Sequence, residues 1–145
     1  MTTSISIPVN RVMVSPAISV SVHDIMDEVS RIFEETGISH LPVIRDEKVV
    51  GIISRTDYYK LIHSFSLFKK KSSEQFNKVV LRSLLAEEVM TTPVTTLPED
   101  AEVIEAVRIF KSHRFHAIPI VDDEGGLVGI ITPWDLLAHA YGEGS

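Results

Sequence analysis

Apolar and polar residues follow one another along the chain in two patterns, one typical of helices and one typical of strands. The first is a stripe with the spacing of a helix face: Ile25, Val29, Ile32 and Phe33. Two apolar runs rich in Val and Ile follow at 41–44 and 49–53, and the polar turn 45–48 between them indicates a hairpin. An extended stretch at 17–20 precedes the helix, and a second helix starts within 54–57. The pattern predicts a β-α-β-β-α unit.

The same unit occurs a second time further along the chain. A shift of 77 residues places Val12-Met13 on Val89-Met90, and ten of the 36 positions from 12 to 47 are then identical. Unrelated stretches of ordinary composition would share roughly two or three. After one inserted residue the shift is 78, and Gly51-Ile52-Ile53 falls on Gly129-Ile130-Ile131. The chain therefore contains a true internal repeat.

The repeat predicts the organisation of the whole chain. We expect an α+β fold (an α/β-type β-α-β-β-α unit) with repeat 1 at 10–62, a helical linker at 63–86 and repeat 2 at 87–141. Two copies are too few for a solenoid, so we expect them to pack face to face about a pseudo-twofold axis. Asp24 and Asp100 are each placed to cap the first helix of their copy.

Composition narrows the classes of function. The 145 residues include no cysteine, which excludes disulfides, thiolate zinc sites and cysteine nucleophiles and agrees with a reducing compartment. The net charge of −6 argues against non-specific binding to nucleic acid. No apolar run reaches the ~18 residues of a membrane span, and residues 1–8 lack the features of a signal peptide. These observations predict a cytoplasmic protein without a membrane partner.

The chemistry-bearing residues lie where the second strand of each hairpin ends. The sequence reads Gly-Ile-Ile-Ser-Arg-Thr-Asp at 51–57 and Gly-Ile-Ile-Thr-Pro-Trp-Asp at 129–135. One interpretation is structural, because a hydroxyl followed three residues later by an acid is close to a capping box. The other is functional, because a helix N-terminus attracts phosphate and a carboxylate accepts hydrogen bonds from ribose hydroxyls. The occurrence of the feature in both repeats favours a nucleotide site.

These motifs together resemble those of the CBS-domain pair, or Bateman module, named after cystathionine beta-synthase. The resemblance depends on Val89–Val94, on the segments 40–43 and 117–122 that contain Pro42 and Pro119, and on the two Gly-Ile-Ile-(Ser/Thr)-x-x-Asp runs. It covers residues 10–62 and 87–141. Each motif is weak alone, but their order, found twice, is specific.

The resemblance implies a regulatory protein without catalytic activity that binds AMP, ADP, ATP or S-adenosylmethionine in two clefts between the repeats. One cleft would use Ile18, Ile38 and Ser39 with Thr132, Trp134 and Asp135. The other would use Thr95, Phe115 and His116 with Ser54, Arg55, Thr56 and Asp57. The aspartates would hold ribose, Ser54 and Thr132 would face phosphate, and backbone groups around Ile18, Ile38, Thr95 and Phe115 would hold adenine. Candidate bases for the phosphate are Arg55, His116, Arg114 and His40. Thr95 is polar where the first cleft has Ile18, which favours the Asp57 cleft.

Other functions stay open at this point. The alternative from another class is a structural or dimerisation module whose clefts are either empty or plugged by bulky side chains such as Trp134 and Phe115. A small nucleotide enzyme is disfavoured because no acid–base pair is organised, and His113-x-x-His116 lacks a carboxylate that would complete a metal site. The resemblance also implies a homodimer, built through paired helices, and a protein target of regulation.

Overall fold

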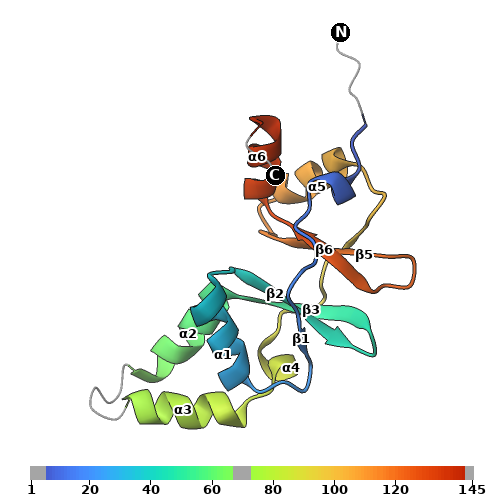
Figure 1. Cartoon of the computed structure of the whole chain (residues 1–145). Helices are drawn as coiled ribbons and strands as arrows, with labels where there is room; N and C mark the ends of the chain where they lie inside the picture. Colours follow the sequence, from blue (N-terminus) through green and yellow to red (C-terminus); the bar gives the residue numbers. More distant parts are fainter. Residues whose placement is uncertain (1–5, 67–72, 143–145) are drawn as a thin grey trace. The chain divides into compact units, whose positions relative to one another are not determined.

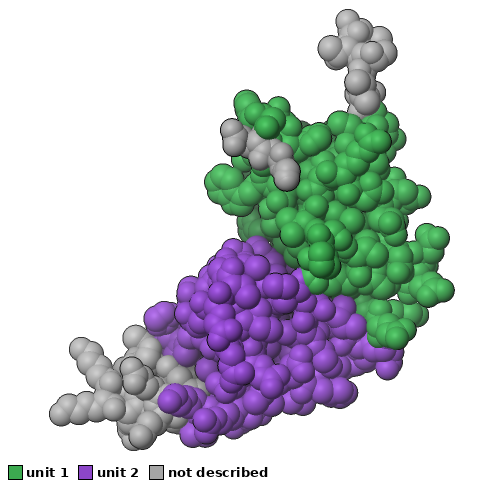
Figure 2. Space-filling model, viewed as in Figure 1, with its two compact units in different colours: residues 1–17, 47–49, 95–145 green, residues 18–46, 50–94 purple. Residues whose placement is uncertain are grey.

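The chain divides into two compact units (Figure 2). The computed structural model describes residues 6–66 and 73–142, without the side chains of 64–66 and 73–77. Unit 1 comprises 1–17, 47–49 and 95–145, and unit 2 comprises 18–46 and 50–94. Among the described residues, no helix has both the length and the apolar character needed to cross a bilayer.

Unit 2 contains a three-stranded sheet with the order β1-β2-β3 (Figure 1). Its elements are β1 (Val20–Ser21), α1 (Met26–Thr36), β2 (His40–Arg45), β3 (Lys48–Ser54), α2 (Arg55–Ser66), α3 (Ser73–Ser83) and α4 (Ala86–Val89). Strand β1 is parallel to β2, with Val20 opposite Val43, so α1 is the crossover helix between them. A two-residue turn joins β2 to β3, and α3 packs against α1 and α2.

Unit 1 repeats this arrangement with a sheet of the order β4-β5-β6. Its elements are a short 3-10 helix (Val9–Arg11), β4 (Leu97–Pro98), α5 (Val103–Lys111), β5 (Ile118–Val121), β6 (Leu127–Ile131) and α6 (Pro133–Ala140). Strand β4 is parallel to β5, and β5 is antiparallel to β6. The predicted β-α-β-β-α unit and the α+β class are therefore confirmed in both repeats.

Two details of the sequence prediction are wrong. The first strand of each repeat forms later than expected, at 20–21 and 97–98 rather than at 17–20 and 94–97. The predicted helix caps also differ, because α1 has Ile25 and α5 has Glu102 at the N-cap. Asp24 instead accepts a hydrogen bond from the backbone N–H of Ser21 at 2.8 Å. Its side chain therefore stabilises the turn after β1 and leaves the helix to begin one residue later.

Each unit has its own apolar core. In unit 2, Val29 and Phe33 of the predicted helical stripe are fully buried against Leu41, Val43 and Ile53 from the sheet. In unit 1, Ala106 of α5 is buried against Ile118, Ile120 and Ile131. The helical stripe and the strand runs therefore face each other, as their periods predicted.

The leading segment of each repeat completes the unit that contains the body of the other repeat. In unit 1, Val14 exchanges two backbone hydrogen bonds with Ile130, at 2.8 and 3.0 Å. In unit 2, Thr91 and Ile52 exchange the equivalent pair, at 2.8 and 3.3 Å. Two further equivalent residues, Val9 and Ala86, are fully buried in the two cores. The sequence repeats and the compact units thus divide the chain at different points.

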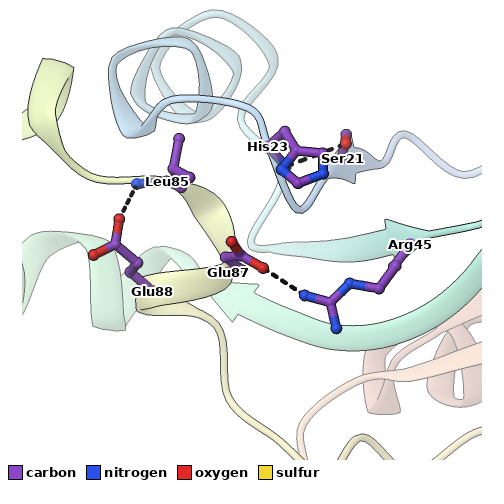
Figure 3. Close-up of polar contacts among 6 residues, drawn as sticks. All are labelled: Ser21, His23, Arg45, Leu85, Glu87 and Glu88. Carbon is purple, nitrogen blue, oxygen red and sulfur yellow. Dashed lines mark hydrogen bonds and ion pairs between the residues drawn. The ribbon is translucent and has the colours of Figure 1, made fainter.

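Polar contacts hold the leading segment of repeat 2 in unit 2 (Figure 3). Glu87 of α4 forms an ion pair with Arg45 at the end of β2. Glu88 accepts a hydrogen bond from the backbone N–H of Leu85 at 3.0 Å, which satisfies a free donor at the start of α4. This short helix is therefore capped at its N-terminus and paired with the end of β2.

Close packing between a methionine and a glycine accompanies each exchanged segment. A Cβ atom added at Gly129 would overlap the Met13 side chain and lie 3.0 Å from the carbonyl oxygen of Val14. A Cβ atom added at Gly51 would overlap the Met90 side chain and lie 3.1 Å from its Cβ atom. Met13 and Met90 pack against the cores, as expected from the sequence. Glycine at these two positions lets the segment approach the sheet.

We predict that Gly129→Ala lowers the free energy of unfolding by about 1 to 3 kcal/mol, the usual cost of overpacking. The backbone of Val14 cannot rotate away from the new methyl group as a methionine side chain can. Gly51→Ala is the matched comparison and should also destabilise the protein, because a rotamer change of Met90 moves its Sδ and Cγ atoms but leaves its Cβ atom 3.1 Å from the new methyl group. Urea unfolding followed by circular dichroism measures both; equal stability of Gly129→Ala and the wild type would contradict the prediction.

Candidate functional site

The turn at Ser54 connects β3 directly to α2. The Ser54 hydroxyl accepts a hydrogen bond from the backbone N–H of Asp57 at 3.0 Å, so it caps the helix. The half-buried carboxylate of Asp57 accepts no hydrogen bond from any residue in the described ranges. It lies in the first turn of α2, where the helix dipole favours a negative charge. Both carboxylate oxygens of Asp57 therefore remain available to a ligand.

The equivalent turn at Thr132 is closed on itself. Asp135 Oδ2 accepts hydrogen bonds from the backbone N–H and the hydroxyl of Thr132, at 2.8 and 3.0 Å. The Thr132 hydroxyl also accepts from the backbone N–H of Asp135 at 3.4 Å. This is the complete capping box that the structural interpretation predicts, with Pro133 at the first helical position. One carboxylate oxygen of Asp135 is therefore engaged in holding the start of α6.

The side chain of Arg55 is bound within unit 2. Its Nε and Nη2 donate to the carbonyl oxygen of Ile38 at 3.0 and 2.7 Å, and Nη2 also donates to the carbonyl oxygen of Phe33. Its Nη1 donates to the Tyr59 hydroxyl at 3.2 Å. The guanidinium carbon lies 5.4 Å from the centre of the Phe33 ring. The base nearest the Ser54 turn thus connects α2 to the end of α1 and the start of β2.

The segments before β2 and β5 differ in their backbone hydrogen bonds. The carbonyl oxygen of Ser39 accepts from the backbone N–H of Arg55 at 2.7 Å. The equivalent residue to Arg55 in repeat 2 is Pro133, which has no N–H to donate. Within the described part of the chain, no residue hydrogen-bonds to the backbone of Phe115 or His116. Those backbone groups are available to a ligand, whereas the carbonyl oxygens of Ile38 and Ser39 already accept from Arg55.

The predicted site residues lie in both units. Unit 2 contains Ile18, Ile38, Ser39, Ser54, Arg55, Thr56 and Asp57, and unit 1 contains Thr95, Phe115, His116, Thr132, Trp134 and Asp135. Trp134 is 77 % exposed and Ile18 is 46 % exposed. Each predicted cleft takes residues from both units, so the pairing of the two sets stays a prediction. No group of three or more metal-ligating side chains occurs among the residues searched, which are the described ones.

Two aromatic residues beside the site were missed in the sequence. Tyr58 is buried, stacks on Phe33 with ring centres 5.5 Å apart, and shares a hydrogen bond with the Ser30 hydroxyl. Burial raises the pKa of the Tyr58 hydroxyl above its ordinary value, so it stays protonated. Tyr59 lies four residues after Arg55, a spacing that places both on one helix face. The i, i+4 spacing in the sequence could therefore have predicted the hydrogen bond between Arg55 and Tyr59.

Comparisons with known proteins identify relatives across most of the chain. The CBS domain family matches residues 9–64 and 86–142. Inosine-5'-monophosphate dehydrogenase of Methanocaldococcus jannaschii is 36% identical over 129 residues, which are 88% of this chain and 22% of the enzyme. The chain thus spans about a fifth of the length of such dehydrogenases. Protein MJ1426 of the same organism is 30% identical over 146 residues, which cover 87% of this chain and 86% of that protein.

Solved structures share the fold. The CBS domain of a membrane protein from Sphaerobacter thermophilus has a TM-score of 0.74 and 30% identity, over 91% of this chain and 86% of that one. The CBS domain pair of protein MJ0100, solved with 5'-methylthioadenosine and S-adenosyl-L-methionine, has a TM-score of 0.74 and 26% identity, over 96% of this chain and 99% of that one. With two matched repeats and two three-stranded sheets of the same topology, this chain belongs to the CBS domain family as a CBS domain pair.

Proposed function

We propose that this CBS pair is a regulatory protein without catalytic activity that binds an adenosine ligand. The observation that carries the proposal is the Asp57 carboxylate, which lies at the start of α2 without a hydrogen-bond donor from the described residues. Two adjacent ribose hydroxyls are donors suited to one carboxylate. The MJ0100 pair, solved with two adenosine compounds, supports this ligand class. The lack of cysteine agrees with the cytoplasm, where we propose that the protein acts.

We place the ligand in the cleft that combines the Asp57 turn with the Phe115 segment. The proposed residues are Ser54, Thr56 and Asp57 from repeat 1 and Thr95, Phe115 and His116 from repeat 2. Both sets offer groups without a hydrogen-bond partner among the described residues: the carboxylate of Asp57 and the backbone of Phe115 and His116. Adenine presents one donor and several acceptors along its edge, which such a backbone segment can pair with.

The other proposed cleft offers fewer free groups. It would combine Ile18, Ile38 and Ser39 with Thr132, Trp134 and Asp135. The carbonyl oxygens of Ile38 and Ser39 accept from Arg55, and Asp135 Oδ2 accepts from Thr132. Ligand binding there would compete with hydrogen bonds that the protein already makes. We therefore expect one strong site per chain.

We predict that AMP or S-adenosylmethionine raises the melting temperature and that Asp57→Ala abolishes the increase. A ligand at a hundredfold excess over Kd contributes about 2.7 kcal/mol, which for a chain of this size corresponds to roughly 5 to 10 °C. Differential scanning fluorimetry with AMP, ADP, ATP, NAD and S-adenosylmethionine measures the increase. Asp135→Ala is the matched control: it loses the capping box, by about 1 kcal/mol, but retains most of the increase due to ligand.

Each outcome of this experiment decides between stated alternatives. The absence of a shift with every compound would favour the structural module with empty clefts. A shift that persists in Asp57→Ala but is lost in Asp135→Ala would mean that the other cleft is the binding site. Chromatography of the compounds after incubation tests catalysis, and any turned-over product would contradict a purely regulatory role.

We also propose that the protein forms a homodimer through α6. Three apolar side chains in and directly after this helix recur at i, i+3 and i+7 and are exposed: Trp134 at 77 %, Leu137 at 49 % and the C-cap residue Tyr141 at 80 %. In unit 2 the equivalent helix α2 is packed by α3, and α5 and α6 have no third helix of this kind within the described part of unit 1. A second copy would cover this face. Ligand occupancy could then reach a protein target through the dimer.

We predict that Leu137→Glu converts a dimer into a monomer. A charge in the middle of an apolar contact is left without a partner when the contact forms, which disfavours association. Light scattering after size-exclusion chromatography gives the mass. Val79→Glu, at an apolar residue of α3 that is 61 % exposed, is the control and should leave the mass unchanged. A monomeric wild type would contradict the proposed dimer.

A further inference from the structure

Arg55 occupies a position from which a side chain could reach a phosphate, yet its donors are directed into the protein. It lies one residue after Ser54 at the start of α2, the usual place for an anion. A guanidinium group has five N–H donors. Four hydrogen bonds use them here, two to the carbonyl oxygen of Ile38, one to that of Phe33 and one to the Tyr59 hydroxyl. One N–H remains.

The positive charge of Arg55 has a partner as well. Helix α1 ends at Thr36, followed by Gly37 with a left-handed backbone, and its last turn contains no basic residue. Phe33, whose carbonyl oxygen accepts from Arg55, belongs to this last turn. The guanidinium group therefore lies at the negative end of the α1 dipole, where a cation is favourable. If the side chain turned toward a ligand phosphate, α1 would lose this charge and two carbonyl groups would lose their donors.

The contacts of Arg55 connect three segments. Its backbone N–H donates to the carbonyl oxygen of Ser39, and its side chain donates to those of Ile38 and Phe33. Thr56 and Asp57 follow Arg55 directly in the chain, so these hydrogen bonds also restrict their positions. Ring contacts with Phe33 and Tyr59, at 5.4 and 5.9 Å, restrict the guanidinium group further. Repeat 2 has Pro133 at the equivalent position, which has neither a backbone donor nor a guanidinium group. The connection is therefore particular to repeat 1.

We propose that Arg55 is a positioning residue for the ligand site: it holds the Asp57 turn in place through the end of α1 and the start of β2, and it does not contact the ligand's phosphate. This inference rests on the proposed adenosine function and replaces the role of phosphate contact that the sequence alone suggested for Arg55. It assigns recognition of the ligand to the nucleoside part, held by Asp57.

A pair of ligands that differ only in the phosphate tests this role. Isothermal titration calorimetry gives Kd for AMP and for adenosine with the wild type, Arg55→Lys and Arg55→Met. For a positioning residue, we expect the Kd of both ligands to rise by the same factor, roughly tenfold, which is the lower end of the loss when a residue that orients metal ligands is removed. The ratio of the two Kd values then stays at its wild-type value, and Arg55→Lys loses less affinity than Arg55→Met because it keeps a positively charged donor group.

Two other variants complete the experiment. Tyr59→Phe removes one partner of the guanidinium group. It should raise the Kd of AMP and of adenosine by the same factor, and this factor should be smaller than that for Arg55→Met. Arg45→Lys, at an arginine of unit 2 that pairs with Glu87, is the control and should leave both Kd values unchanged. Loss of AMP binding with unchanged adenosine binding in Arg55→Lys would overturn the proposal in favour of a direct phosphate contact. Unchanged Kd values for both ligands in both Arg55 variants would also overturn it.

The design separates this inference from the proposed function. A wild type that binds neither AMP nor adenosine contradicts the adenosine function itself. In that case amide hydrogen exchange still tests the connection, because Arg55→Lys should increase exchange at the amides of residue 55 and Asp57, which donate to Ser39 and Ser54, relative to Arg45→Lys. Equal exchange in the two variants would show that Arg55 does not hold these segments.

Discussion

A single local constraint underlies this structure: in each repeat the last strand of the hairpin runs directly into a helix, and a hydroxyl side chain must cap the first turn. At Ser54 only one hydrogen bond forms: the Ser54 hydroxyl accepts from the backbone N–H of Asp57, and no group of the described residues donates to the Asp57 carboxylate. At Thr132 the cap is reciprocal and uses one oxygen of Asp135. The same motif therefore leaves a free carboxylate in one repeat and an engaged one in the other, and the proposed function depends on that difference.

The exchange of leading segments makes the two repeats depend on each other for folding. Val9 is buried in the core that contains Ile118 and Ile131, while Ala86 is buried in the core that contains Phe33 and Leu41. Neither repeat contains all the residues of one core. Gly51 and Gly129 permit this arrangement because the absence of a Cβ atom leaves room for Met90 and Met13.

The two repeats have diverged at one position with several consequences. Arg55 supplies a backbone donor to Ser39 and side-chain donors to Ile38, whereas Pro133 supplies none to the segment before β5. Strand β2 accordingly starts at His40, and β5 starts one position later in the repeat, at Ile118. A proline that stabilises the start of α6 thus leaves the carbonyl oxygens of Phe115 and His116 without donors among the residues that the structure describes. A substitution within one helix turn changes which backbone groups can meet a ligand.

The repeat, the β-α-β-β-α order, the hairpins and the two capped turns were predictable from the sequence, because all of these depend on residues close together in the chain. The errors of the sequence prediction were local too: Asp24 and Asp100 were expected to cap helices that begin after Ile25 and Glu102. The tertiary structure alone decided which unit each leading segment joins, and that Arg55 turns toward Phe33 and Ile38. It also decided that Asp57, unlike Asp135, is left without a donor among the described residues. These outcomes depend on contacts between residues far apart in sequence. A side chain such as that of Arg55 has several possible partners, and the packing of the core decides which carbonyl oxygens and aromatic rings lie beside it.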